Sequence, residues 1–204
     1  MMEINPHPVQ ACTIHVPGSK SYSHRLLMAS ALSNGMCTVD DCLKSDDTRF
    51  TIQALKQLGV RIEDNGRQLS IKGKNGCFDA CGEPIFLGNS GTSMRLLTAL
   101  ATLGKGTYVL TGSARMQERP LDDLLDGLTQ IHGDVQSVKG NGCPPVKVAG
   151  GRVQGGGLTL RCGTSSQYLS AILLISPCTR QGVEIDVIEG PVSKPYIDMT
   201  IHVM

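Results

Sequence analysis

Apolar side chains recur at helical spacing in two stretches of the chain. Leucines and one isoleucine fall at i, i+3, i+4, i+7 and i+10 over residues 121–131, on one face of an amphipathic helix. A thinner stripe of the same kind covers residues 52–58. Gly59 directly after it indicates a helix end, the run 60–62 is typical of a strand, and Gly133 begins a similar ending after the first stripe. The pattern predicts two helices, each followed by a strand.

Short runs rich in apolar and β-branched residues predict further strands. These runs are residues 12–16, 69–71, 107–110, 145–148, 158–160 and 183–187. They alternate along the chain with helical stretches, which indicates an α/β architecture.

Three helix starts are similar in sequence. They read Ser21-Tyr-Ser-His-Arg25, Gly91-Thr-Ser-Met-Arg95 and Gly163-Thr-Ser-Ser-Gln167, and an apolar helical stretch follows each of them. Arg25 and Arg95 are 70 residues apart, and Arg95 and Gln167 are 72 residues apart. The sequence therefore predicts an internal repeat of about 70 residues.

A second set of similar motifs begins near residues 45, 118 and 193, and within it Pro120 and Pro195 are 75 residues apart. A unit of this length exceeds the usual solenoid repeat, so each is expected to fold as strand, helix, strand, helix and two more strands, a βαβαββ module. The expected units cover about 18–83, 84–155 and 156–204. The third stops after its second helix, so roughly 25 to 35 further residues are expected after Met204. We therefore expect the chain to be part of a longer protein.

Composition narrows the possible classes of protein. The 204 residues include 19 basic and 18 acidic side chains and are 40% apolar, which argues against disorder and leaves no charge excess for a nucleic-acid backbone. Aromatic residues, at 3%, are too few to offer stacking platforms for single strands. No apolar run approaches the roughly 20 residues that span a bilayer, and no secretory signal is evident. We expect a soluble, cytoplasmic protein with neither a nucleic-acid nor a membrane partner.

The eight cysteines and five histidines are scattered along the chain. A zinc site requires a second clustered cysteine pair or a histidine pair at short spacing, and neither is present in the sequence. We expect reduced thiols and no metal.

The repeated helix starts favour anion binding. A helix N-terminus presents free N–H groups and a partial positive charge, Ser and Thr hydroxyls add donors, and arginine offers a bidentate fork. Lys20, Arg25, Arg95 and Arg119 would form a cationic cluster if the repeats direct them at one cleft. The natural ligand of such a cluster is a small molecule with several negative charges.

Five segments closely resemble the 5-enolpyruvylshikimate-3-phosphate synthase family, also called 3-phosphoshikimate 1-carboxyvinyltransferases. They are Pro17-Gly-Ser-Lys-Ser-Tyr-Ser-His-Arg25, Leu87-Gly-Asn-Ser-Gly-Thr-Ser-Met-Arg95, Met116-Gln-Glu-Arg-Pro120, Ser165-Ser-Gln167 and Ser193-Lys-Pro-Tyr-Ile-Asp198. They correspond to the family's N-terminal half. The resemblance implies the enolpyruvyl transferase fold, with two similar lobes of three βαβαββ units each. Residues 1–17 would lead in as a strand or hinge from the other lobe, and 18–204 would form the N-terminal substrate-binding lobe.

The resemblance also implies transfer of the enolpyruvyl group of phosphoenolpyruvate to the 5-hydroxyl of shikimate 3-phosphate, in the shikimate pathway and without a cofactor. The residues that match shikimate 3-phosphate contacts are Ser21, Arg25, Ser165, Ser166, Gln167, Ser193 and Tyr196. Those that match phosphoenolpyruvate contacts are Lys20, Asn89, Gly91, Thr92, Arg119 and Gln167. Lys20 would be catalytic, as an electrostatic and proton-handling group. The acid and base carboxylates would lie in the absent C-terminal lobe, so this chain is expected to bind without turnover.

Two alternatives remain. The related UDP-N-acetylglucosamine enolpyruvyl transferases typically carry Lys-Asn where this chain has Lys20-Ser21, and a reactive cysteine that residues 112–118 lack. The other alternative is a non-catalytic module that only binds shikimate 3-phosphate.

His24 stands where many members of the resembled family carry Asn, and it is assigned no role in proton transfer. Asp46 and Asp47 are interpreted as first-turn acids that favour the helix dipole.

Overall fold

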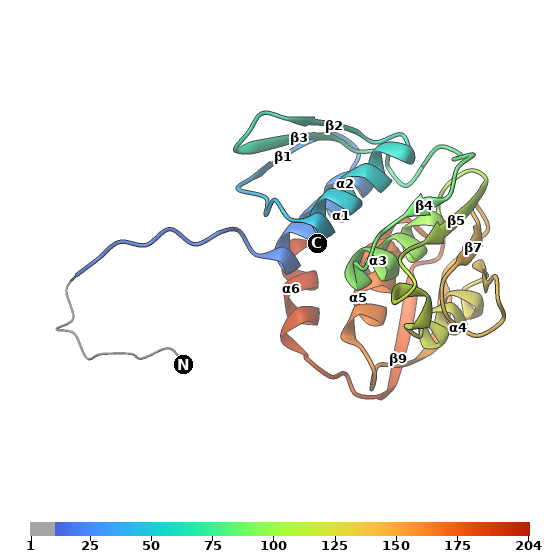
Figure 1. Cartoon of the computed structure of the whole chain (residues 1–204). Helices are drawn as coiled ribbons and strands as arrows, with labels where there is room; N and C mark the ends of the chain where they lie inside the picture. Colours follow the sequence, from blue (N-terminus) through green and yellow to red (C-terminus); the bar gives the residue numbers. More distant parts are fainter. Residues whose placement is uncertain (1–10) are drawn as a thin grey trace.

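The computed structural model describes residues 11–204. Of the expected lead-in over 1–17, residues 1–10 lie outside the described part. Residues 11–19 carry no helix or strand. Gly18 lies against Asp41, and the segment before it extends away from the body of the molecule (Figure 1). The strand predicted at 12–16 is therefore wrong. An alternating run forms a strand only where a neighbour takes up its backbone hydrogen bonds, and no described strand lies beside this one.

Seventeen elements follow one another along the described chain. The first segment contains α1 (Lys20–Leu32), β1 (Met36–Asp40), α2 (Asp46–Gln57), β2 (Arg61–Asp64) and β3 (Gln68–Lys72). The middle segment contains β4 (Ile85–Phe86), α3 (Gly91–Ala101), β5 (Thr107–Thr111), η1 (Met116–Glu118), α4 (Asp122–Gln130), β6 (Asp134–Ser137) and β7 (Val146–Ala149). The last contains β8 (Gly156–Arg161), α5 (Ser166–Ile175), η2 (Ser176–Cys178), β9 (Val183–Glu189) and α6 (Pro195–Val203). The predicted order of strands and helices is found in full in the middle segment.

Three small sheets share one topology. The middle sheet has the order β4-β5-β7-β6, with β4 parallel to β5 and the other pairs antiparallel. The first sheet, β1-β3-β2, repeats the antiparallel part, and the last, β8-β9, repeats the parallel pair. The first segment lacks a described counterpart of β4, and the last ends after its second helix. The middle sheet thus contains all four strands of one βαβαββ pattern, and the other two sheets contain parts of it.

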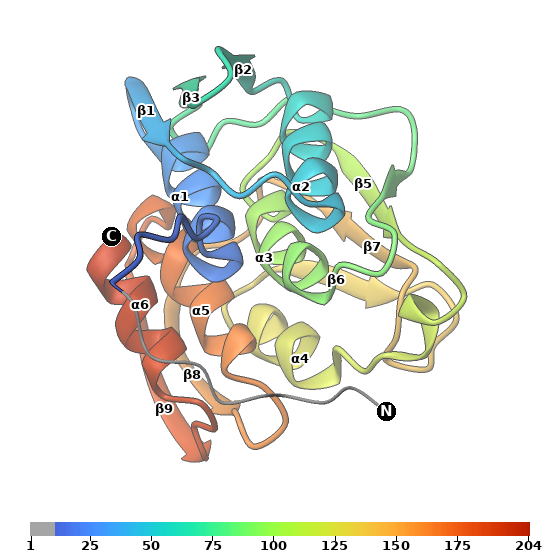
Figure 2. The same cartoon turned by 60° about the vertical axis from the view of Figure 1, so that its left-hand side comes forward.

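The helices lie between the sheets. α3 and α5 pack against each other at the centre, while the three sheets lie at the periphery (Figure 2). Ten of the eleven residues of α3 are buried. The predicted stripe over 121–131 is buried at all five apolar positions, which confirms that helix. α6 lies at the edge, with Ile201 and Met204 more than half exposed.

The helices α2 and α4 both end at a residue with a left-handed backbone, but the type of residue differs. Gly59 adopts a φ of 82° after α2, as the glycine there predicts. After α4 the left-handed residue is His132, with a φ of 67°, and Gly133 follows it. A Cβ on Gly133 would lie 2.7 Å from the carbonyl oxygen of Leu128, so this glycine is needed for space. The prediction of a repeated ending is correct in place, but the residue that reverses the chain differs.

Candidate functional site

Serine side chains cap the helices that follow the three similar motifs. Ser19, Ser90 and Ser165 are the N-caps of α1, α3 and α5, and each accepts a hydrogen bond from a first-turn backbone N–H. The third motif lies in another register, because α3 begins at its Gly91 whereas α5 begins at Ser166, after the aligned glycine. Gln167 is therefore the second residue of its helix. The alignment by sequence found the helix starts but misplaced the third by three residues.

A cavity of about 290 Å³ lies where the starts of four helices meet. Its lining comes from the first turns of α1, α3 and α5 and from the residues around the start of α6. The lining residues are Lys20, Ser21, Arg25, Thr92, Thr164, Ser165, Ser166, Gln167, Val192, Ser193 and Tyr196. They include two cations, six hydroxyl-bearing side chains other than tyrosine and no carboxylate, so the cavity suits an anion.

Nine of the twelve predicted site residues line this cavity, and three do not. Asn89 and Arg119 are exposed outside it, and Gly91 is buried at the start of α3. The sequence assignment omitted Thr164 and Val192. Thr164 lies within the third motif, so the motif itself was the available signal, whereas nothing in the sequence marks Val192.

Arg25 is held rigidly at the floor of the cavity. Its side chain is 2% exposed, and its guanidinium donates to the Thr200 hydroxyl over 2.7 Å, to the Ser170 hydroxyl over 3.1 Å and to the Ser21 carbonyl over 3.0 Å. Its Cζ also lies 5.8 Å from the centre of the Tyr196 ring. Burial lowers the pKa of Arg25 below its ordinary value, although a guanidinium stays charged in proteins. A fixed, partly desolvated cation of this kind binds an anion with little loss of side-chain entropy.

Gln167 joins α5 to α3 across the cavity. Its Nε2 donates to the Thr92 hydroxyl over 3.3 Å. Its Oε1 is buried and has no partner among residues 11–204. An unpaired buried acceptor is costly, and a ligand hydroxyl that donates to it would remove that cost.

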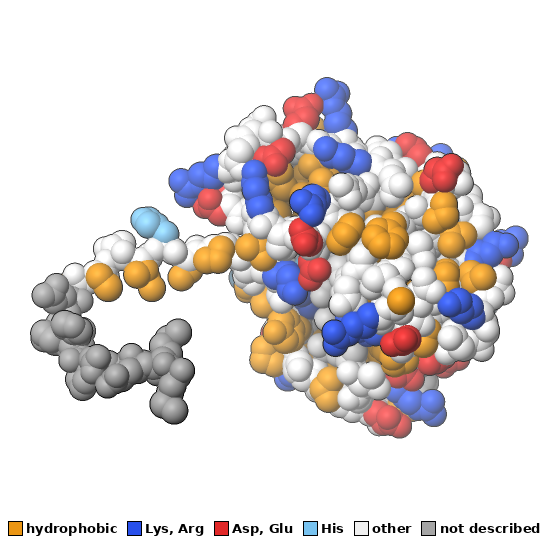
Figure 3. Space-filling view, in the orientation of Figure 1, with side chains coloured by type: hydrophobic (Ala, Val, Ile, Leu, Met, Phe, Trp, Pro, Cys, Tyr) orange, Lys and Arg blue, Asp and Glu red, His pale blue; other side chains and the backbone are white. Residues whose placement is uncertain are grey.

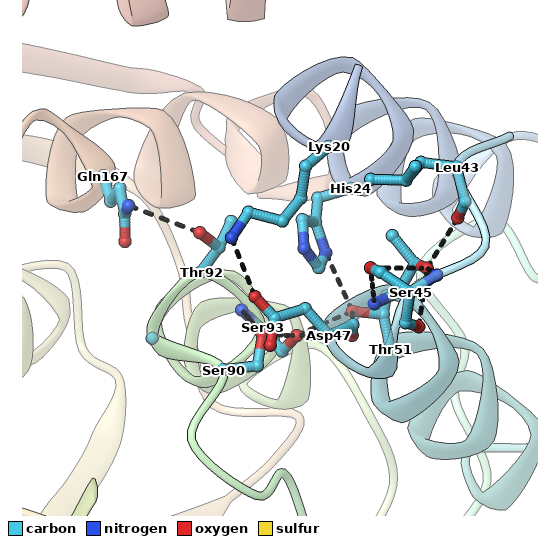
Figure 4. A network of polar contacts seen from close by, with 12 residues as sticks. Lys20, His24, Leu43, Ser45, Asp47, Thr51, Ser90, Thr92, Ser93 and Gln167 are labelled. Carbon is cyan, nitrogen blue, oxygen red and sulfur yellow. Dashed lines mark hydrogen bonds and ion pairs between the residues drawn. The ribbon is translucent and has the colours of Figure 1, made fainter. Parts of the chain in front are cut away.

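Lys20 is the first residue of α1 and lines the cavity, and its ammonium group also forms an ion pair with a carboxylate of α2. Its Nζ lies 2.9 Å from Oδ2 of Asp47 on α2, as Figure 4 shows, and the two side chains are 51% and 30% exposed. Asp46 and Asp47 do lie in the first turn of α2, as predicted. The contact of Asp47 with Lys20 joins residues 27 positions apart, and no local pattern in the sequence indicates it.

The cationic cluster expected from the sequence is only partly assembled. Arg95 is buried, donates to the Gly91 carbonyl over 2.9 Å and lies with its Cζ 5.5 Å from the centre of the Tyr168 ring. It does not line the cavity, so its expected place there is wrong. Arg119 lies next to Gly91, because a Cβ on that glycine would be 2.7 Å from Arg119 Nη1. Lys20 and Arg25 therefore form the cationic wall, with Arg119 close to the adjoining turn.

The start of α6 adds a strained residue. Ser193 has a φ of 54°, in the left-handed region that non-glycine residues rarely adopt. It lies in the cavity wall together with Tyr196. Lys194 between them points to solvent and pairs with Asp198 over 2.7 Å, as expected of an exposed turn residue. Backbone strain of this kind is common at binding sites.

A larger cavity, of about 470 Å³, lies between α2 and the first sheet. Its charged side chains largely neutralise one another, since Lys44 pairs with Asp64 and Arg49 pairs with Asp46. Its interior is apolar, with Ile52, Ile62 and Leu69 among the lining residues. It offers no convergent set of donors, so the smaller cavity is the better candidate site.

The described residues show neither a metal cluster nor a membrane span. Among residues 11–204, no three histidine, cysteine or acidic side chains are placed to hold a metal ion. No helix within the same range is long and apolar enough to cross a membrane. Figure 3 shows basic and acidic side chains interspersed over one face of the molecule, in keeping with a net charge of +1.

Comparisons with known proteins agree with this geometry. The profile of the family EPSP synthase (3-phosphoshikimate 1-carboxyvinyltransferase) matches residues 5–204. A 3-phosphoshikimate 1-carboxyvinyltransferase of Hamiltonella defensa is 45% identical over 94% of this chain and 45% of its own length. One of Shewanella halifaxensis is 41% identical over 100% of this chain and 48% of its own length.

Solved structures give the same result. EPSP synthase from Acinetobacter baumannii superposes with a TM-score of 0.78 and 32% identity, over 87% of this chain and 41% of that one. The chain thus spans about half the length of the curated relatives it matches. The match covers both the sequence and the arrangement of helices and sheets described above, and the chain belongs to the EPSP synthase family.

Proposed function

We propose that this chain forms the N-terminal, substrate-binding lobe of a 3-phosphoshikimate 1-carboxyvinyltransferase. The whole enzyme would transfer the enolpyruvyl group of phosphoenolpyruvate to the 5-hydroxyl of shikimate 3-phosphate and release phosphate. The observation that carries the proposal is the cavity with Lys20, Arg25 and several hydroxyls but no carboxylate, at the starts of four helices. Family membership supports the choice of anion.

Shikimate 3-phosphate is the proposed occupant of this cavity. Ser165 and Ser166 at the start of α5, with Ser21 and Arg25 on α1, offer hydroxyl, backbone and guanidinium donors to a phosphate. Gln167 presents its unpaired Oε1 to a ring hydroxyl, while Ser193 and Tyr196 close the wall on the side of α6. The chemistry of each side chain matches one part of a phosphorylated, hydroxylated ring.

Phosphoenolpyruvate is proposed to bind next to this ligand, between Lys20 and the turn that holds Asn89, Gly91 and Thr92. The absence of a side chain on Gly91 leaves room for Arg119 and for close approach of a carboxylate or phosphate. The vinyl carbon is protonated and the hydroxyl deprotonated, which gives a tetrahedral intermediate that then loses phosphate. The Lys20 ammonium would stabilise the leaving phosphate and take part in proton transfer.

The acid and base carboxylates are proposed to come from a second lobe of the same protein. In agreement, no carboxylate among the described residues lines the cavity. The 204-residue chain would accordingly bind shikimate 3-phosphate without turning it over. A location in the cytoplasm stays a prediction.

Calorimetry with shikimate 3-phosphate tests the proposal. We expect micromolar-range binding to the chain, weakened at least about tenfold by Arg25→Lys, which keeps the charge but loses the fork. Lys44→Met, at an exposed lysine outside the cavity, is the matched control. A folded chain that binds no shikimate 3-phosphate would contradict the assignment of the cavity, and phosphate release by the chain alone would contradict the need for a second lobe.

A chimaera separates the enzyme from a pure binding module. Residues 1–204 would be joined to the remaining part of the Shewanella halifaxensis relative, and phosphate release would be measured. Turnover supports the enzymatic reading. Binding by the chain together with an inactive but folded chimaera would favour the non-catalytic module. The family match and the named relatives favour this reaction over that of the UDP-N-acetylglucosamine enolpyruvyl transferases.

A further inference from the structure

His24 is fully buried on α1, one turn after Lys20 and next to Arg25, and the proposed mechanism gives it no part. Its side chain is 0% exposed. Its Nδ1 lies 2.9 Å from the Thr51 hydroxyl on α2, while its Nε2 is buried with no partner in the part of the chain that the structure describes. A buried imidazole with one paired nitrogen calls for an explanation.

The contact of His24 is the first of a chain of hydroxyl contacts. The Thr51 hydroxyl lies 2.7 Å from that of Ser93, which lies 2.6 Å from that of Ser90. Figure 4 shows this network crossing from α1 to α2 and on to α3. Thr51 and Ser93 also donate to the backbone carbonyl of Asp47, each over 3.3 Å. The network thus touches the residue that pairs with Lys20 and the serine that caps α3.

Burial of the ring opposes its protonation. The pKa of His24 is lowered to about 4, chiefly by burial and to a smaller extent by the neighbouring cations Lys20 and Arg25, against the raising effect of Asp47. The imidazole is therefore neutral near pH 7. In the neutral form only one ring nitrogen carries a proton. The two tautomers therefore differ in whether the unpaired Nε2 is a donor or an acceptor.

The unpaired nitrogen decides the tautomer. If Nε2 carried the proton, a buried N–H donor would have no acceptor. If Nδ1 carries it, Nδ1 donates to Thr51, whose hydroxyl then donates onward to Asp47 O or Ser93, and only an acceptor lone pair remains unused. An orphaned buried N–H is rarer than an under-used acceptor, so the second arrangement is favoured.

We propose that His24 is a positioning residue, which donates from Nδ1 to Thr51 and through the Thr51–Ser93–Ser90 hydroxyls sets the spacing of the α1, α2 and α3 N-termini around the anion cavity. It acts on Lys20 through the backbone of Asp47, and on the turn before Gly91 through Ser90. This role rests on the proposed function of the cavity, but the coupling between the three helix starts is measurable without any ligand.

Nuclear magnetic resonance of the 204-residue chain tests the arrangement directly. Long-range ¹H–¹⁵N spectra of the histidine rings should show His24 with a protonated Nδ1 and a bare Nε2, unchanged between pH 5 and pH 8. A protonated Nε2, or titration near the ordinary histidine pKa of about 6.5, would overturn the proposal.

Substitutions test the coupling. His24→Leu should shift the backbone amide signals of Asp47 and of Ser90 to Thr92, whereas His24→Asn, whose amide can replace the Nδ1 donor, should restore them. Thr98→Val removes a buried hydroxyl of α3 that bonds only within its own helix, and it is the matched control. Shifts confined to the neighbours of residue 24, or equal in the leucine and asparagine variants, would show that His24 only fills space.

The link to function is measured with shikimate 3-phosphate. We expect His24→Leu to weaken binding to the chain about five- to tenfold and His24→Asn to stay within about twofold. Thr51→Val gives a second disruption of the same network, and in a double variant its effect should not add to that of His24→Leu. Wild-type affinity in both single variants, or additive losses, would refute the positioning role. Failure of the wild-type chain to bind would refute the proposed function instead, while the ligand-free spectra still decide the coupling.

Discussion

The guanidinium Nε of Arg25 donates to the Thr200 hydroxyl over 2.7 Å, although 175 positions separate the two residues. Thr200 is fully buried in α6, and its hydroxyl also lies 2.9 Å from that of Ser170 on α5. One cluster of three side chains thus joins α1, α5 and α6 beside the cavity that Arg25 lines. Burial disfavours the charged form of Arg25 and lowers its pKa, and the hydrogen bonds of this cluster offset that cost.

Thr200→Val should destabilise the chain by about 2 kcal/mol, since it removes the acceptor of a buried, charge-assisted hydrogen bond. Urea unfolding at pH 7 measures this. Thr38→Val, at an exposed position of β1, should change stability by less than about 0.5 kcal/mol. Equal effects of the two substitutions would mean that Arg25 does not depend on Thr200.

Lys20→Met should change stability by less than about 1 kcal/mol, because the ion pair with Asp47 is largely exposed. The same substitution should lower turnover of the chimaeric enzyme by about a hundredfold or more, because it removes the proposed partner of the leaving phosphate. Lys44→Met is the control for loss of an exposed, paired lysine. A Lys20→Met chimaera with normal turnover would exclude Lys20 from catalysis.

Gly91→Ala should weaken phosphoenolpyruvate binding, seen as a raised KM in the chimaera, with little change in the affinity for shikimate 3-phosphate. The new methyl group would come within 2.7 Å of Arg119 Nη1 and 2.6 Å of Arg95 Nη1, so at least one guanidinium must move. Gly157→Ala is the control, because nothing lies within 4 Å of its added Cβ. A KM unchanged in both variants would remove Arg119 from the proposed site.

Gln167→Met should weaken shikimate 3-phosphate binding about tenfold while leaving stability unchanged or slightly raised. The substitution removes a buried oxygen that has no partner among the described residues, so the free chain loses little. Calorimetry and urea unfolding give the two numbers. Gln57→Met, exposed at the end of α2, should alter neither. A clear loss of stability would show instead that the contact with Thr92 is what matters.

His24 should make the chain less stable in mild acid. Its pKa is about 4 in the folded state against 6.5 for an ordinary histidine, so between these values the unfolded state binds more protons. Its contribution is constant above pH 6.5, falls as the pH drops towards 4, and amounts to a loss of about 2 kcal/mol between pH 7 and pH 5. Urea unfolding at the two pH values should show this loss, and His24→Asn should abolish most of it. The same loss in the asparagine variant would place the titrating group elsewhere.

Local patterns in the sequence predicted most of the elements. The apolar stripe over 121–131 predicted α4, four of the six strand runs lie within strands of the structure, and a fifth, 145–148, overlaps β7. These succeed because amphipathic periodicity and glycine stops act over a few residues. The run over 12–16 fails because a strand also needs a neighbour. Strands β1 and β4 were not predicted, and in β4 two residues are too few to show a period.

The similar motifs predicted the helix starts and most of the cavity wall. Serine, threonine and basic residues before an apolar stretch indicate an anion-binding helix start from local chemistry alone. Both arginines occupy the same place in their motifs, and the sequence could not show that Arg25 lines the cavity whereas Arg95 is buried against Tyr168 outside it. That difference depends on which helices surround each one.

The sequence alone determined most of the helices and strands, the repeat of its motifs and the family resemblance, and it predicted an anionic ligand. Only the tertiary structure decided that Lys20 meets Asp47, that Arg25 meets Thr200, and that His24 reaches Ser90 through Thr51 and Ser93. Apart from the local contact between Ser90 and Ser93, these contacts join residues 27 to 175 positions apart. Secondary structure and capping follow from short-range sterics and hydrogen bonding, whereas the partners of a buried polar group are set by how whole helices pack.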